Sequence, residues 1–139
     1  MPVPPTSIFD SSALLALLKD ERGADVVEAA LAGGFAMNLV NWAEVLTWTI
    51  RRGGAVNTLK QQLNESGILS DDGLLTLLPI SESDAEFAAN LYPSTRHAGL
   101  SLGDRLCIAT ANRLRLPVLT ADQAWSTLPL PGVNIQVIR

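Results

Sequence analysis

Short apolar runs alternate with longer segments of helical pattern, and this alternation constrains the fold more than any other feature of the chain. The strand-length apolar runs fall at residues 6–9, 35–40, 74–80, 116–122 and 133–139. The segments typical of helices fall at residues 11–21, 24–34, 42–54, 55–67, 81–92 and 101–115. Strands separated by helices are joined by β-α-β crossovers. The sequence therefore predicts an α/β fold with a mostly parallel sheet covered by helices on both faces.

Length and charge limit the organisation and the partners. The 139 residues fit a single domain spanning 1–139, and a hydrophobic content of 47% disfavours disorder. The net charge of −4 excludes a global basic field, so an anionic partner would need a local basic patch or a bound metal. Charged residues make up only 17%, which suggests that a partner covers part of the surface.

The cysteine count and the N-terminal sequence indicate the cellular compartment to expect. Cys107 is the only cysteine, so no intrachain disulfide can form, and we expect a reducing, cytoplasmic setting. No signal-peptide pattern and no apolar run long enough to span a membrane is present, so we expect no membrane association. His97 is the only histidine, which excludes a ribonuclease mechanism that uses two histidines.

Four acidic residues fall where the predicted strands end or the following helices begin. Asp10 directly follows the first strand and Asp122 ends the fourth, while Glu44 and Asp104 lie in the first turns of two helices. Each stands among apolar neighbours, which is unusual for a surface carboxylate. Because function in parallel α/β folds sits at the carboxyl ends of the strands, we expect the four to meet at one edge of the sheet.

Each acid also has a local structural explanation. Asp10 and Asp122 suit helix N-caps or turns, and Ser101 with Asp104 resembles a capping box. Glu44 could interact with the helix dipole. Taken singly, these explanations compete well with a functional one, but they do not explain why all four acids fall on one predicted edge.

Several carboxylates in one cleft repel each other, and a divalent cation removes that conflict. Oxygen ligands of this kind suit Mg²⁺ or Mn²⁺. Such a metal lowers the pKa of a bound water and clamps a phosphodiester for in-line attack. The residues thus indicate metal-dependent phosphodiester chemistry.

Four segments resemble PIN-domain ribonucleases, and specifically the VapC-type toxins of type II toxin–antitoxin pairs. These segments are "FDSSALLALLKDE" (9–21), "NWAEVL" (41–46), "SLGDRLCIATA" (101–111) and "VLTAD" (118–122), in the family's order and with similar spacing. The resemblance implies a PIN-like three-layer α/β/α fold and cleavage of RNA, often a structured tRNA or rRNA. It also implies a homodimer and inhibition by a cognate VapB-like antitoxin that lies across the active-site groove.

The resemblance further implies roles for individual residues. Asp10 and Asp104 would hold the main Mg²⁺ or Mn²⁺. Glu44 would bind it directly or through water and help to orient the attacking water, and Asp122 would act through water or on a second metal. The remaining candidates are Ser11 and Thr120, which would hydrogen-bond to the carboxylates unless they serve only in capping and turns, and Arg105, which would pair with an acid or with substrate.

Two other functions stay open at the level of the sequence. One is a non-catalytic module that binds its antitoxin and nucleic acid and carries an idle acidic site; four intact acids weigh against it. The other is a phosphatase-like or nucleotide-binding domain, which is disfavoured because no glycine-rich phosphate loop follows the first strand. The RNA target is not encoded in any motif.

Overall fold

The structure is a computed structural model that describes residues 3–130 and 132–139, and a five-stranded parallel sheet lies at its centre. The strands are β1 (Ser7–Phe9), β2 (Phe35–Asn38), β3 (Leu75–Leu78), β4 (Val118–Thr120) and β5 (Ile135–Val137). Their order in the sheet is β3-β2-β1-β4-β5, so β1 lies in the middle between β2 and β4. The predicted mostly parallel sheet is confirmed, and every described strand pairing is parallel.

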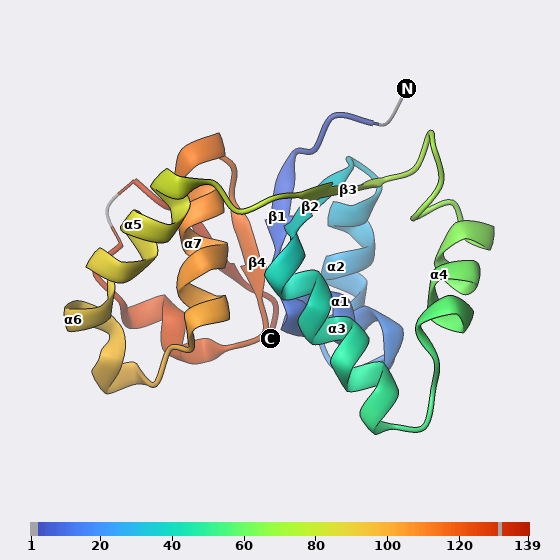
Figure 1. Cartoon of the computed structure of the whole chain (residues 1–139), viewed down its shortest axis with the longest axis horizontal. Coiled ribbons are helices and arrows are strands. Elements are labelled where there is room, and N and C mark those ends of the chain that lie inside the picture. The colour runs from blue at the N-terminus through green and yellow to red at the C-terminus, as the bar shows by residue number, and fades with distance from the viewer. Residues whose placement is uncertain (1–2, 131) are drawn as a thin grey trace.

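Helices flank the sheet on both sides, as predicted (Figure 1). The α-helices are α1 (Ser11–Leu18), α2 (Ala24–Leu31), α3 (Leu39–Arg51), α4 (Val56–Glu65), α5 (Glu82–Asn90), α6 (Tyr92–Thr95) and α7 (Leu102–Leu114). Two short 3₁₀ helices, η1 (Arg96–Ala98) and η2 (Gln123–Thr127), complete the described elements. No helix among the described residues is long and apolar enough to cross a membrane.

The alternation of side chains along β1 separates two hydrophobic layers. Phe9 faces the layer formed with α1 to α4, where its ring stacks on Phe35 at a centroid distance of 4.1 Å. Ile8 faces the opposite layer, where Cys107 and Ile108 of α7 cover the sheet. Successive strand residues point to opposite faces, so one strand supplies both cores. The arrangement is the three-layer α/β/α fold expected from the sequence.

The region around Pro93 differs from the prediction that a helix runs to residue 92 and stops. The helix α5 ends at Asn90, and α6 begins at Tyr92 with Pro93 in its first turn. A proline is tolerated there because the first turn of a helix needs no hydrogen bond from its backbone nitrogen.

Candidate active site

Asp10 is the most buried of the four candidate carboxylates, with 3% of the residue exposed. It caps α1 directly after β1, and its Oδ1 accepts hydrogen bonds from the Ser12 hydroxyl at 2.7 Å and the Ala13 N–H at 2.8 Å. Oδ2 accepts one from the Thr120 hydroxyl at 2.6 Å. Burial raises the pKa of Asp10 to about 6; these hydrogen bonds oppose the rise and the charge of Asp104 adds to it. Asp10 is therefore both a helix cap and a buried carboxylate whose charged form is disfavoured.

Two hydroxyls join the ends of β1 and β4 around Asp10. The Ser12 hydroxyl also accepts the Ala121 N–H at 2.9 Å, and the Thr120 hydroxyl accepts the Asp122 N–H at 3.1 Å. The predicted contact from Thr120 to a carboxylate is thus present. The serine contact was assigned to the wrong residue: Ser12, not Ser11, donates to Asp10, because the second residue of α1 lies beside the capping carboxylate.

Glu44 lies in the first half of α3 and is held by a buried amide. The Asn41 Nδ2 donates to Glu44 Oε1 at 2.7 Å and to the Gly103 carbonyl at 3.1 Å, which ties α3 to the first turn of α7. Gly103 permits this approach, because a Cβ there would lie 2.9 Å from both Glu44 carboxylate oxygens. Sequence reasoning missed Asn41 and Gly103; the polar residue one turn before Glu44 was the only available signal for the former.

Asp104 is half-buried and completes a capping box with Ser101, the local role that the sequence also suggested. Its Oδ2 accepts the Ser101 N–H at 2.9 Å, and Oδ1 accepts no hydrogen bond from the described part of the chain. Burial raises the pKa of Asp104 against the hydrogen bonds from Ser101, and the charge of Asp122 raises it further. The cap uses one carboxylate oxygen and leaves the other for a ligand.

Asp122 and Arg105 lie at the periphery of this group. Asp122 is exposed and caps η2, where Oδ1 accepts the Ala124 N–H at 3.0 Å. The Arg105 Nη1 donates to the Ala88 carbonyl at 2.8 Å, and its guanidinium lies 5.3 Å from the centre of the Tyr92 ring. Arg105 is thus engaged on the side of α7 that faces α5 and α6, and its contact with substrate stays a prediction.

The thiol of Cys107 marks the point around which three carboxylates gather. It is fully buried, one turn along α7 from Asp104, and burial raises its pKa well above the ordinary value. The charges of Asp10, Asp104 and Glu44 raise it further, in that order. The contacts of the chain place the acids at the carboxyl edge of the sheet: Thr120 bonds Asp10 and the backbone of Asp122, and Glu44 lies against Gly103, the neighbour of Asp104. Cys107 itself is a buried free thiol.

The donors at this edge fit a divalent cation by their chemistry. They are oxygen ligands, their negative charges destabilise one another, and Oδ1 of Asp104 is unengaged by the described residues. Among residues 3–130 and 132–139, no three acidic, histidine or cysteine side chains already lie close enough to coordinate one ion. A cation would therefore have to draw the carboxylate side chains together.

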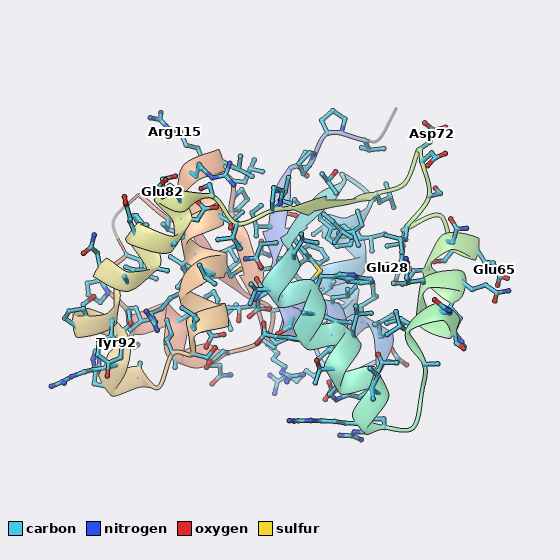
Figure 2. The ribbon with its side chains drawn as sticks, viewed as in Figure 1. Glu28, Glu65, Asp72, Glu82, Tyr92 and Arg115 are labelled. Carbon is cyan, nitrogen blue, oxygen red and sulfur yellow. The ribbon has the colours of Figure 1, made fainter. Side chains whose placement is uncertain are left out.

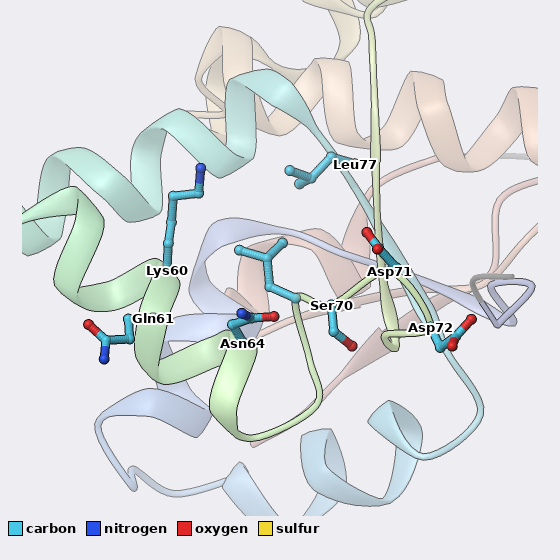
Figure 3. Close-up of a pocket in the computed structure, with 8 residues that line it drawn as sticks. Lys60, Gln61, Asn64, Ser70, Asp71, Asp72 and Leu77 are labelled. Carbon is cyan, nitrogen blue, oxygen red and sulfur yellow. The ribbon is translucent and has the colours of Figure 1, made fainter.

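Two surface cavities differ in how close they lie to the acidic edge, which is the carboxyl edge of the sheet with Asp10, Glu44, Asp104 and Asp122. The larger, of about 790 Å³, lies between α4 and the loop before β3, and none of the four acids lines it (Figure 3). A second, of about 490 Å³, runs along α3 beside the acidic edge. Its lining residues are Leu15, Val40, Ala43, Glu44, Thr47, Trp48 and Arg51. The second cavity is the one that adjoins the candidate site, because Glu44 belongs to both.

Fold and site together define an α/β domain with carboxylates gathered at the carboxyl edge of a parallel sheet. The PIN domain family matches residues 7–129, so the chain belongs to the PIN domain family. PIN domains are generally nucleases that use divalent metal ions. No curated protein sequence matches the chain.

Several solved structures share this fold at low sequence identity. A toxin–antitoxin complex from Klebsiella pneumoniae contains a chain that is 23% identical, with a TM-score of 0.66 and coverage of 96% of this chain and 98% of that one. FitAcB from Neisseria gonorrhoeae gives 19% identity, a TM-score of 0.66 and coverage of 95% and 97%. VapBC2 from Rickettsia felis, bound to promoter DNA, gives 12% identity, a TM-score of 0.67, and coverage of 94% of this chain and 97% of that one. At these identities the likeness establishes the shared fold.

Proposed function

We propose that this protein is a metal-dependent endoribonuclease toxin of the VapC type. The observation that carries the proposal is geometric: in a PIN domain, Thr120 links Asp10 to the backbone of Asp122 at the ends of β1 and β4, and Glu44 lies against Gly103, the neighbour of Asp104. Local capping explains Asp10, Asp104 and Asp122 individually, but it does not explain a buried carboxylate with a raised pKa facing further carboxylates.

Each residue of the site would have its own role in the proposed reaction. Asp10 and Asp104 would hold Mg²⁺ or Mn²⁺, and Glu44 would bind it directly or through water. Asp122 would act through water or on a second metal. Ser12 and Thr120 orient Asp10. A bound cation supplies a water of lowered pKa and a clamp on the phosphodiester.

The Glu44 carboxylate is suited to orient the attacking water and to accept its proton, since Asn41 engages Oε1 and fixes the orientation of the group. The water oxygen forms a bond to phosphorus as the bond to the 3′ oxygen breaks. The 3′ oxygen takes up a proton, and the products carry a 5′-phosphate and a 3′-hydroxyl.

A cognate VapB-like antitoxin and a homodimer belong to the same proposal. Of the solved relatives named above, the one from Klebsiella pneumoniae is described as a toxin–antitoxin complex, and VapBC2 from Rickettsia felis is bound to DNA from its promoter. In this chain, Leu39 and Leu102 begin α3 and α7 next to the acidic edge and are 47% and 57% exposed. These two side chains would be available to a partner that lies across this edge. A cytoplasmic location fits such a system.

The test compares the wild-type protein with Asp104→Asn, both free of antitoxin, on total RNA with Mn²⁺ and then with EDTA. Asparagine at position 104 still accepts the Ser101 N–H through its amide oxygen, so the variant removes the charge and keeps the cap. We expect discrete cleavage by the wild-type protein that is lost with EDTA and in the variant. Sequencing of the new 5′ ends identifies the target.

Glu82→Gln is the matched control, because Glu82 is an exposed acid in the first turn of another helix. It should cleave like the wild-type protein. Equal cleavage by the wild-type protein and Asp104→Asn, or products that end in a 2′,3′-cyclic phosphate, would overturn the proposal. An idle binding module would bind RNA and leave it intact at every metal concentration.

A further inference from the structure

The helix α3 presents one continuous stripe from the acidic edge to a group of cations. Val40, Glu44, Thr47, Trp48 and Arg51 follow helical spacing and line the cavity of about 490 Å³. From Glu44 to Arg51 the helix rises by about 10 Å. Figure 1 shows α3 continuing past the carboxyl edge of the sheet, so its C-terminal end stays on the side of the molecule that carries the acids.

A basic patch lies where this stripe ends. It consists of Lys19, Arg22, Arg51, Arg52 and Arg139, all exposed. These are half of the ten lysines and arginines in a chain of net charge −4. Two acids, Asp20 and Glu21, lie between Lys19 and Arg22 in the sequence, and Glu21 pairs with Lys19 at 2.8 Å and with Arg139 at 3.9 Å. The five cations outnumber these two acids, so the patch keeps an excess of positive charge.

Trp48 organises the patch from within the cavity. The Lys19 ammonium lies 5.2 Å and the Arg52 guanidinium 5.0 Å from the centre of a Trp48 ring. Cation–π contacts of this kind restrict long side chains that would otherwise move freely. Two cations are thus held in place next to the cavity before any ligand arrives.

We propose that the cavity along α3 and the basic patch bind the sugar–phosphate backbone of a single-stranded RNA segment next to the cleaved bond. The inference rests on the proposed function and extends it, because it assigns the path of the substrate away from Glu44. Lys19, Arg51 and Arg52 contact phosphates, and Trp48 is a positioning residue for two of them. Charge complementarity supports an RNA occupant, since the patch is a local positive region on an acidic protein.

The test measures binding of a fluorescein-labelled single-stranded RNA of mixed sequence to Asp104→Asn protein, with EDTA, over a series of salt concentrations. Adding Arg51→Gln and Arg52→Gln together should weaken binding about tenfold at low salt and reduce the salt slope by about 0.7 for each lost phosphate contact. Trp48→Leu should weaken binding while the number of charged side chains is unchanged.

The matched control removes two positive charges elsewhere, with Lys60→Gln and Arg115→Gln. Arg115 directly follows α7 and lies at the top of the view in Figure 2, whereas α3 ends at the bottom of the same view in Figure 1. We expect this control to bind RNA like its parent. Urea denaturation of every variant separates lost folding from lost contacts.

Three outcomes would overturn the inference. Equal weakening in both double variants would mean that only net charge matters. Unchanged RNA binding in the variant with Arg51→Gln and Arg52→Gln would refute the role of the patch. If the same two changes, made without the Asp104 change, also leave metal-dependent cleavage intact, the proposed function still stands. Unchanged RNA binding with loss of antitoxin binding would make the patch a protein interface.

Discussion

Gly103→Ala should displace the Glu44 carboxylate without unfolding the protein. The new Cβ would lie 2.9 Å from both carboxylate oxygens, whereas ordinary contacts begin at 3.4 Å, so the carboxylate must shift by about 0.5 Å. The flexible end of a glutamate moves more readily than backbone. The displacement therefore falls on Glu44 and on its 2.7 Å hydrogen bond from Asn41.

The expected change in stability is small because two effects oppose each other. Alanine in place of glycine favours a helix by about 0.5–1 kcal/mol. Weakening the hydrogen bond from Asn41 to the charged Glu44 costs up to about 1.5–3 kcal/mol. The free energy of unfolding should thus fall by no more than about 2.5 kcal/mol. Since a 1 Å error in position can lower a rate about a hundredfold, a shift of half that size should lower cleavage on the order of tenfold.

The assay combines urea denaturation, Mn²⁺ titration by calorimetry and RNA cleavage on wild-type, Gly103→Ala, Asn41→Ala and double-variant proteins. If both single changes act through the position of Glu44, their effects on Mn²⁺ affinity and cleavage should be less than additive. Wild-type Mn²⁺ affinity and cleavage in Gly103→Ala would refute the reasoning. A loss of stability well above 3 kcal/mol would also refute it, because the backbone rather than Glu44 would then have moved.

Three further predictions concern the supports of the site and its charges. Ser12→Ala should lower the free energy of unfolding by about 1–3 kcal/mol, because the Ser12 hydroxyl bonds both Asp10 and the chain after β4. Ser11→Ala should change it by less than about 0.5 kcal/mol. Equal losses in urea denaturation would contradict the assignment of the contact to Ser12. With EDTA, stability should fall as the pH rises from about 4 through 6, because the pKa of Asp10 is raised by burial to about 6 and its favourable contribution exists only while the group is protonated. The fall due to Asp10 should approach about 3 kcal/mol, and Asp10→Asn should remove that part, leave the part due to the raised pKa of Asp104, and abolish the stabilisation by added Mn²⁺ in thermal unfolding. Asp84 behaves in the opposite sense: burial raises its pKa, but the hydrogen bonds from Arg113 and Ser81 outweigh burial and hold it below the ordinary value. The contribution of Asp84 to the free energy of unfolding should persist above about pH 4 and disappear as the pH falls further. Arg113→Gln should lower the free energy of unfolding by about 2–4 kcal/mol at neutral pH. It should also weaken the loss of stability on acidification, measured by circular dichroism.

Local pattern was enough to find the acids but not their supporting contacts. Asp10 and Asp122 follow strands in the sequence, and parallel strands deliver such residues to one edge whatever the details of packing. Ser11 and Ser12 are the same residue type at adjacent positions, so only the geometry of the first turn of α1 shows that Ser12 reaches Asp10. The start of α6 at Tyr92 was missed for a similar reason, since Pro93 both stops one helix and suits the first turn of the next.

The sequence by itself determined the α/β class, the parallel sheet and the positions of Asp10, Glu44, Asp104 and Asp122 near strand exits, because periodicity and turn chemistry act over a few neighbouring residues. The tertiary structure alone decided how these acids are held and what surrounds them. Asn41 is 62 residues from Gly103, and Lys19 meets Trp48 only because α1 packs beside α3. Contacts between distant segments depend on the packing of layers, which no local pattern specifies.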